Sequence, residues 1–487
     1  MARTSTHCGS ARFRHPARMT TAAVTRRDVL KGAAALGAGA ALGRAVPARA
    51  ARRDRVAIVG AGAGGVAAAY FLAGDFGVDL FEARSRIGGH CDSRTIDDRG
   101  RRLTVDLGAQ FFHPDTHPIY VTLLEELGLF NPAHPDADAT IEAPGSLCIF
   151  PVASGPPRFT STDPLATPER AVEFARFTQL ARDAVLSGMA WETTLDDWIA
   201  GLPLSAAFKA EVLAPWLTAL IGCTRSAAAR TSARSILQTF ALSFPADIVR
   251  GATTYNSRIG LQGNLQRLLD RAAGARVHLR AAVHALARTR DGWFLQTHAG
   301  RRGPYRYVLL NAPPRVGRRL LRPLRGFGDV CELLHAYTTF DSRLVIHTDP
   351  AYMPAERADW TAYNAGIDGR ECEGSAWLGA LLGEPVEVFK SWAERRPTEP
   401  RQIVVQRRFK HPLITRPAIE AARGLQPLQG RGGLYFSGQY TTAMDLQETA
   451  VWSAMQVAEA VAPQSRTLQA LKQRLALTGR ADVSYAL

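Results

Sequence analysis

The first residues that could do chemistry are the glycines of the segment Gly60-Ala61-Gly62-Ala63-Gly64-Gly65. A short apolar, β-branched run precedes them in residues 55–59, and an alanine-rich run typical of a helix follows in residues 66–72. Between a strand and a helix, Gly60 permits a tight turn, Gly62 lets the backbone approach a pyrophosphate, and Gly65 allows helix and strand to pack closely. The free N–H groups at the start of that helix would bind phosphate. The pattern therefore predicts a dinucleotide site.

Glu82 supports this prediction from the end of the next expected strand, residues 78–81. An acidic residue about 20 positions after the glycines is placed to accept hydrogen bonds from ribose hydroxyls. A glycine-rich turn without a ligand does not account for that position.

The residues that follow distinguish FAD from NAD. They read Glu82-Ala83-Arg84-Ser85-Arg86-Ile87-Gly88-Gly89-His90 and resemble the E-A-x-x-x-x-G-G-R segment of the flavin-containing amine oxidase and phytoene desaturase superfamily. The resemblance implies that Glu82 and Arg84 hold the adenosine ribose, and that Gly88 and Gly89 approach the cofactor a second time. His90 stands where the family has arginine, so a hydrogen bond replaces a charge contact with the pyrophosphate.

Three later segments continue the resemblance. Gly108, in the run Val105–His113, corresponds to a stretch that passes beside the isoalloxazine in the family. Residues 276–283 alternate like a strand, and the resemblance implies that the backbone of Val283 faces adenine. Gly438 and Gln439 end an apolar strand that holds the ribityl chain in the family, with Gln439 in place of the usual acid.

A helix is expected to start after Asp445, with its N-terminus directed at the flavin. Gln447 and Glu448 would then supply N-terminal amides, and a positive dipole end there stabilises an anionic reduced flavin. Asp445 and Glu448 also have the spacing of a capping box, which predicts a well-capped helix.

Candidate catalytic residues are few. His411 precedes Pro412 and is interpreted as an active-site wall or acid/base, or else as part of a surface turn. His347 is interpreted as a satisfied histidine at a strand end. Many amine oxidases of the superfamily keep a flavin-proximal lysine, but residues 303–345 contain none, and Lys410 is the one plausible substitute. No cluster with metal-ligand spacing occurs, so no metal is expected.

These residues require an α/β fold with a Rossmann-like FAD-binding domain built from separated segments, and an α+β substrate domain with a large helical insertion. The boundaries are predicted as follows: a signal peptide in residues 1–50; the FAD-binding domain in 51–115, 255–318 and 425–465; the substrate domain in 116–254 and 319–424; and a C-terminal tail in 466–487.

The first fifty residues predict export. Arg26 and Arg27 precede a mild Ala/Gly/Leu run, and Ala48-Arg49-Ala50 fits a signal-peptidase site, so this segment resembles a twin-arginine signal. An arginine-rich tail is the alternative. About half of the net charge of +15 lies in this segment, and the remaining basic residues are spread out, which argues against nucleic-acid binding.

The favoured function is an exported FAD-dependent oxidoreductase that removes a hydride from a small organic substrate onto flavin N5. The substrate would be an amine or a lipid- or polyene-like compound, and the missing lysine favours desaturation or isomerisation over amine oxidation. The electron acceptor would be oxygen or a quinone. The FAD would be non-covalent, because superfamily members with a thioether use a late cysteine and none follows Cys372. The alternatives are an NAD(P)-dependent dehydrogenase, which would not explain Gly88 or Gly438, and a flavin-binding scaffold without turnover.

Overall fold

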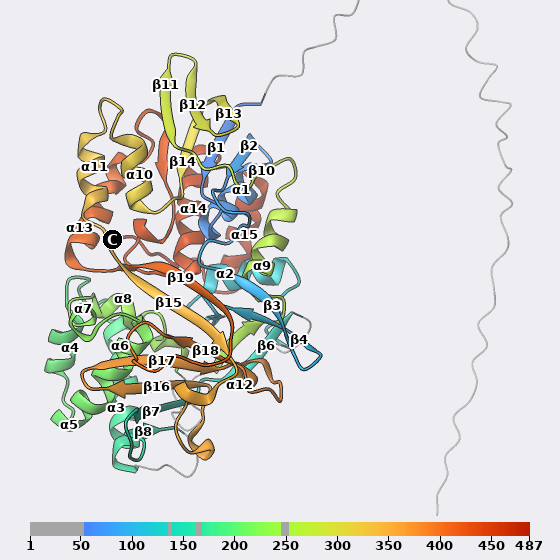
Figure 1. Cartoon of the computed structure of the whole chain (residues 1–487). Helices are drawn as coiled ribbons and strands as arrows, with labels where there is room; N and C mark the ends of the chain where they lie inside the picture. Colours follow the sequence, from blue (N-terminus) through green and yellow to red (C-terminus); the bar gives the residue numbers. More distant parts are fainter. Residues whose placement is uncertain (1–52, 135–138, 162–167, 245–252) are drawn as a thin grey trace, which may run out of the picture. The chain divides into compact units, whose positions relative to one another are not determined.

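The computed structural model describes residues 53–134, 139–161, 168–244 and 253–487 (Figure 1). The predicted signal peptide in residues 1–50 lies outside the described residues. Residues 53–487 form one unit.

A five-stranded parallel sheet joins segments that are far apart in the sequence. Its strands, in spatial order, are β10 (Arg276–His278), β2 (Gly77–Phe81), β1 (Arg55–Val59), β14 (Tyr307–Leu310) and β20 (Leu434–Phe436). The central strand β1 is buried along Val56–Val59, as expected for a parallel strand that is covered on both faces. This sheet confirms the predicted Rossmann-like fold. The strand expected over residues 276–283 is shorter, because β10 ends at His278 and Arg280 takes a positive φ of 53°.

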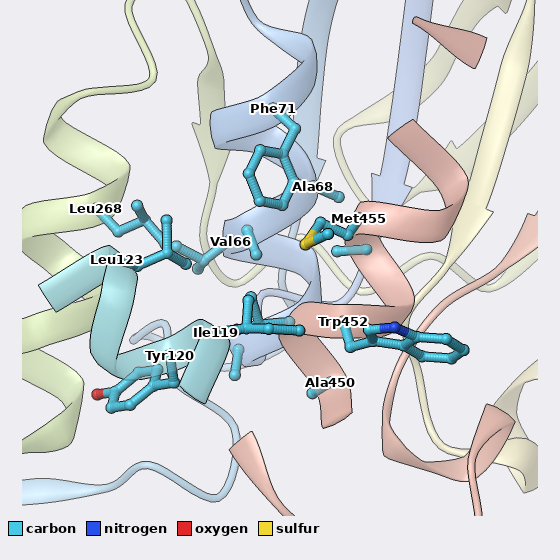
Figure 2. Close-up of a cluster of buried hydrophobic side chains, with 14 of the residues drawn as sticks. Val66, Ala68, Phe71, Ile119, Tyr120, Leu123, Leu268, Ala450, Trp452 and Met455 are labelled. Atoms are coloured by element: carbon cyan, nitrogen blue, oxygen red, sulfur yellow. The ribbon is translucent and has the colours of Figure 1, made fainter. Parts of the chain in front are cut away.

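Helices α1 and α14 make the main contact on one side of this sheet (Figure 2). Nine of the ten residues of α1 are buried, so this helix is covered all round rather than along one stripe. Figure 2 shows Val66 and Phe71 of α1 in the same cluster as Ile119, Leu268 and Met455. The helices of this layer are α1 (Ala63–Leu72), α2 (Pro118–Glu126), α9 (Gly260–Asp270), α14 (Gln447–Val461) and α15 (Arg466–Leu477).

A second core cluster includes Trp293 and Phe327 and joins the parallel sheet to a small antiparallel sheet and to helices after β14. The elements around it are β11 (Ala285–Thr289), β12 (Gly292–Thr297), β13 (Gly300–Tyr305), α10 (Pro314–Leu321), α11 (Gly328–His335) and α13 (Arg416–Leu425).

A seven-stranded mixed sheet forms the other large layer (Figure 1). Its order is β19 (Ile403–Leu413), β15 (Thr338–His347), β18 (Phe389–Trp392), β17 (Glu371–Trp377), β16 (Tyr363–Asp368), β7 (Leu147–Pro151) and β8 (Phe159–Thr160). The predicted large helical insertion begins at Pro168 and packs on this sheet through α6. It comprises α3 (Pro168–Leu186), α4 (Leu195–Gly201), α5 (Ala206–Phe208), a π-helical turn (Lys209–Leu213), α6 (Ala214–Ile221), α7 (Arg225–Ala228) and α8 (Ala233–Leu237). The short α12 (Leu378–Leu382) follows β17.

Short strands lead from the glycine loops to the larger sheet. The hairpin of β3 (Ser93–Asp98) and β4 (Arg101–Asp106) is followed by β5 (Phe111–Phe112), which pairs with β9 (Thr253–Ser257). The other neighbour of β9 is β6 (Thr140–Pro144). Residues 106–112 therefore connect the hairpin of β3 and β4 to the three-stranded sheet of β5, β9 and β6.

The cysteines of the described chain are buried and form no disulfide: Cys91, Cys148, Cys223, Cys331 and Cys372. Among the described residues, no helix combines the length and apolar character that a membrane crossing needs.

Candidate functional site

The glycine loop between β1 and α1 shows which glycines the protein itself requires. Gly60 has a φ of +107°, and a Cβ there would lie 2.6 Å from the Asn311 carbonyl oxygen. A Cβ on Gly65 would lie 2.0 Å from the Gly60 oxygen, and one on Gly64 would lie 2.6 Å from Asn311 Oδ1. A Cβ on Gly62 would meet nothing closer than 3.5 Å. Gly62 is therefore the one glycine of the four that chain packing does not demand, which fits a ligand lying against it.

The start of α1 fits a phosphate group. Gly62 is its N-cap residue and makes no side-chain capping bond. The first N–H groups of a helix have no partner within the helix, and the helix dipole adds positive charge there. Asn311, which follows β14, donates from Nδ2 to the Gly60 oxygen at 3.1 Å, while its buried Oδ1 has no partner in the described chain. This unpaired acceptor also fits a ligand-binding loop, and Asn311 was not predicted from the sequence.

Glu82 lies at the end of β2 and faces the same loop. Its Oε2 accepts from the Ala61 N–H at 2.9 Å and its Oε1 from the Arg84 N–H at 2.8 Å. The carboxylate is thus oriented by the backbone and keeps acceptor capacity on both oxygens. Arg84 is exposed, and the side chain of Val283 is buried in the cluster around Trp293. The contacts expected from all three to a nucleotide stay predictions.

The second glycine loop touches the first. Gly88 donates to the Ala61 oxygen at 2.7 Å and forms a parallel bridge with Gly62, and a Cβ on Gly89 would lie 3.2 Å from the Gly62 Cα. Positive φ angles of 106° and 61° explain the two glycines. The two loops together outline the proposed pyrophosphate site.

Arg86 holds the second loop, and the sequence analysis did not assign it a role. Its guanidinium donates to the oxygens of Ile87 (3.0 Å) and Gly89 (2.9 Å) and pairs with the buried Asp92 at 2.7 Å. Asp92 also pairs with Arg94 and Arg407. The position of Arg86, two residues before Gly88, is the sequence feature that could have indicated its role in holding this loop.

His90, His411 and Asp445 meet beyond the second glycine loop. The rings of His90 and His411 are 5.0 Å apart, and His411 Nδ1 lies 3.5 Å from Asp445 Oδ2. His411 Nε2 is buried and has no partner in the described chain. Burial and, to a smaller extent, the neighbouring His411 lower the pKa of His90 to about 4, so His90 is neutral at pH 7. Burial raises the pKa of Asp445, but His411 and His90 outweigh this and hold it below its usual value.

His411 is located in the strand β19 opposite Phe340, so its interpretation as part of a surface turn was wrong. The three side chains also each offer one ligand atom for a metal, all within 4.8 Å of one another. His90 is far from His411 and Asp445 in the sequence, so the spacing of these residues could not predict that the three meet. The expected absence of a metal stays a prediction.

Lys390 lies beside Gly108. Its Nζ donates to the Gly108 oxygen at 2.7 Å and to Gln110 Oε1 at 2.9 Å, and the residue is 1% exposed. Burial lowers the pKa of Lys390 well below that of an exposed lysine, and the nearby Asp106 carboxyl opposes this. Burial in turn raises the pKa of Asp106. A Cβ on Gly108 would lie 1.9 Å from the His90 oxygen, so this glycine is also required by packing.

The choice of Lys410 as the substitute lysine was wrong. Its Nζ lies 2.7 Å from Asp341 Oδ1, and both side chains are about half exposed. The buried lysine next to Gly108 is Lys390, which lies on β18, a strand that pairs with β15.

The helix α14 starts at Gln447 without the predicted capping box. Its N-cap residue is Leu446, which makes no side-chain capping bond. Asp445 contacts His411, and Glu448 accepts from the N–H groups of Ile119 (3.0 Å) and Tyr120 (2.7 Å) at the start of α2. The N-terminus of α14 is therefore without an N-cap side chain.

Other predicted residues lie around α14. Gln447 Nε2 donates to the Phe111 oxygen at 2.9 Å, which joins α14 to β5. The Gly438 N–H donates to Ser453 Oγ at 2.7 Å, and Gln439 begins a short 3-10 turn after it. His347 is fully buried and bonds the Asp349 oxygen and Ser391 Oγ, which supports its interpretation as a satisfied histidine.

The parallel sheet, the glycine loop before α1 and the acidic residue at the end of β2 define a dinucleotide-binding protein of the oxidoreductase type. A sequence profile of the family described as flavin containing amine oxidoreductase matches residues 63–345. The chain belongs to this family. It is a flavin oxidoreductase, and the prediction of this enzyme class is confirmed.

Solved structures of this fold are similar over most of the chain. Putrescine oxidase bound to putrescine aligns with a TM-score of 0.59 and 17% identity, over 84% of this chain and 99% of the other. A CLA-producing fatty acid isomerase from P. acnes aligns with a TM-score of 0.59 and 14% identity, over 84% and 99%. Cyclohexylamine oxidase from Brevibacterium oxydans aligns with a TM-score of 0.54 and 14% identity, over 84% and 99%. At these identities the likeness establishes the fold.

A profile of the twin-arginine translocation signal matches residues 23–43, which lie outside the described residues. The expected export by the twin-arginine pathway is thereby confirmed. A comparison with curated proteins finds no match.

Proposed function

We propose that the protein binds FAD non-covalently and oxidises a C–H bond of a small organic substrate, an amine or a lipid- or polyene-like compound. When bound, the flavin supplies the acceptor for the hydride equivalent. The residues that would hold it are Gly60, Gly62, Ala63, Gly64, Gly65, Glu82, Arg84, Gly88, Gly89, His90, Gly108, Val283, Gly438, Gln439 and Gln447. The proposal is supported by Gly62, which chain packing does not require to be glycine, and by the unpaired Asn311 Oδ1.

His411 carries the proposal for catalysis. Its free Nε2 can take or return a proton, while Asp445 holds Nδ1 and orients the ring. Such a group serves the release of a proton from an oxidised substrate, and it also serves proton return in an isomerisation. The unpaired His411 Nε2 is therefore the observation that supports isomerisation as a second candidate function.

Amine oxidation was disfavoured from the sequence because no lysine was expected near the proposed flavin site. Lys390 lies against Gly108, so this reason no longer applies. With a lowered pKa, Lys390 is able to hold or exchange a proton near neutral pH. Amine and lipid-like substrates thus both fit the proposed chemistry.

Anaerobic titration of the purified yellow protein tests this proposal. We expect benzylamine or an unsaturated fatty acid to bleach the flavin absorbance, and oxygen or a quinone to restore it. If neither compound bleaches the flavin, and if the photoreduced flavin reacts with neither oxygen nor a quinone, the protein is a flavin-binding scaffold and the proposed oxidation is wrong.

The mode of attachment is tested by acid precipitation. The described chain has no cysteine after Cys372, and that residue is buried in the larger sheet, so we expect all colour in the supernatant. Colour retained in the pellet would show a covalent bond.

A further inference from the structure

Buried polar side chains without partners gather around Phe111. Phe111 pairs with Asn256 across the ladder of β5 and β9. Asn256 is 2% exposed, and neither its Oδ1 nor its Nδ2 has a partner in the described chain. Thr254, two residues earlier on the same face of β9, has a buried hydroxyl that interacts with Tyr363.

His117 adds an unpaired donor. Its ring centroid lies 6.4 Å from that of Phe111, and the residue is fully buried. Its Nδ1 accepts from the His113 N–H at 3.3 Å and lies 2.8 Å from Thr116 Oγ1, which assigns the proton to Nε2. Nε2 has no partner in the described chain. Burial lowers the pKa of His117 to about 3, so the ring is a neutral N–H donor.

Tyr363 approaches Phe111 from the larger sheet. The two ring centroids are 6.3 Å apart, and the Tyr363 hydroxyl is buried. Burial raises the pKa of Tyr363 to about 12, and a side-chain hydrogen bond with Thr254 opposes the rise, so the phenol stays protonated. Thr254, Asn256, His117 and Tyr363 are called the Phe111 cluster below.

Folded proteins pair nearly all their buried polar groups, so the unpaired Asn256 amide and His117 Nε2 beside one ring indicate a missing partner. Asn364, on the same strand as Tyr363, shows the ordinary case. It is also 2% exposed, but its Nδ2 donates to the Thr361 oxygen at 2.7 Å and its Oδ1 accepts from the Thr361 N–H at 3.1 Å.

The Phe111 cluster adjoins the proposed flavin site. The Phe111 oxygen accepts from Gln447 at the start of α14, and Gln110 accepts from Lys390. The cluster offers donors and acceptors but no charge. A charged group would lose its hydration there without a counter-charge, whereas a neutral group would be fully bonded.

We propose that the Phe111 cluster binds an uncharged hydrogen-bonding group of the substrate, such as an alcohol or an amide, with the adjoining carbon skeleton against Phe111. This inference rests on the proposed function in that it takes the ligand to be the substrate.

Three probes of one shape test the charge preference: benzamide, benzamidinium and benzoate. Each is titrated into the flavin-loaded protein while the flavin absorbance spectrum is followed. We expect benzamide to bind about tenfold more tightly than either ion, and Asn256→Leu to weaken it by about tenfold. Tighter binding of an ion overturns the proposal, and so does an unchanged affinity in Asn256→Leu.

Thermal unfolding provides a readout that needs no turnover. Asn256→Leu removes an unpaired polar group, so it should not lower the Tm, whereas Asn364→Leu should lower it by about one to two degrees. If Asn256→Leu lowers the Tm as much as Asn364→Leu, Asn256 is structural. If Asn256→Leu and Tyr363→Phe both lose flavin, the missing partner is the cofactor. Failure of the proposed oxidation would appear separately, as unbleached flavin in wild type.

Discussion

At the scale of single residues, Glu82 does two things at once. Its carboxylate accepts from the N–H groups of Ala61 and Arg84, which fixes the first glycine loop relative to the end of β2. The remaining lone pairs are then available to ribose hydroxyls in the proposed site. Glu82 thus organises the protein side of the site before it contacts a ligand.

We predict that Glu82→Ala weakens FAD binding by about tenfold to a thousandfold, because charge-assisted hydrogen bonds are lost and water recovers part of them. The FAD affinity of Glu82→Gln should lie between those of wild type and Glu82→Ala, since the amide oxygen of glutamine still accepts a hydrogen bond. Titration of apoprotein by flavin fluorescence quenching measures both. Glu387→Ala is the control, because Glu387 is exposed and its one ion pair within the described residues is with Arg357. Equal affinities of wild type and Glu82→Ala would remove Glu82 from the site.

Lys390 and Lys410 form a matched pair. We predict that Lys390→Met slows flavin reduction at least about tenfold, as expected for the loss of a proton-exchanging group. We expect Lys410→Met, which breaks only an exposed ion pair, to have no effect. Because burial lowers the pKa of Lys390, the wild-type rate should rise with pH below the ordinary lysine range. That rise should vanish in Lys390→Met. If it persists, the titrating group is another residue.

At the scale of elements, Glu448 joins three segments. It lies in the first turn of α14, caps the start of α2 and accepts from the Tyr485 hydroxyl at 3.0 Å. The N-cap residue of α2, His117, makes no capping bond with its own side chain. A carboxylate from a different helix therefore replaces the local cap, and it ties the residues beyond α15 to the same point.

The pH dependence of stability should report this contact. Burial raises the pKa of Glu448 from 4.5 to about 7, against the N–H donors of α2. The folded state therefore binds more protons than the unfolded state between these values, and stability falls as pH rises from about 4.5 to about 7. The shift corresponds to a loss on the order of 3 kcal/mol. Glu448→Gln should flatten this part of a plot of Tm against pH, whereas Glu459→Gln, at an exposed ion pair on the same helix, should not. An unchanged slope in Glu448→Gln would assign it to other groups.

Elements with local signals were predictable from the sequence, and contacts between distant elements were not. The glycine loop, Glu82 and the helical stretch before residue 244 follow from spacing and periodicity within short windows. Glu448 was expected to cap its own helix, because the capping-box pattern contains nothing about α2. Lys390 was passed over because only the register of β18 against β15 brings it to Gly108. The pairing of His411 with Asp445 depends in the same way on two segments that meet only in the folded chain.

At the scale of the molecule, the described chain combines a nucleotide-type sheet with a larger mixed sheet, and an arginine-rich signal precedes both. The twin-arginine route carries folded proteins. A cofactor bound between two loops of the folded protein is compatible with this route, because it need not be released for transport.

We predict that Arg26→Lys combined with Arg27→Lys leaves the protein in the cytoplasm, since the paired arginines are the feature that the twin-arginine signal presents. Cell fractionation followed by immunoblotting measures the distribution. Arg12→Lys with Arg14→Lys, outside the matched residues 23–43, is the control and should be exported normally. Normal export of the Arg26/Arg27 variant would show that another segment directs it.

The pairing of β14 with β20 has a consequence for the order of events during synthesis. The first two strands of the parallel sheet are made by residue 81, but its outer strand ends at Phe436 and the helix α14, which packs on α1, ends at Val461. At ~5–20 residues per second, a ribosome needs about 20–70 s to make the intervening chain. The first glycine loop therefore lacks α14 until Val461 has been made. Chains that terminate before this point would lack all or part of this helix, and the earliest of them the partner strand of β14, so flavin loading would select for molecules that contain both before they reach the export machinery.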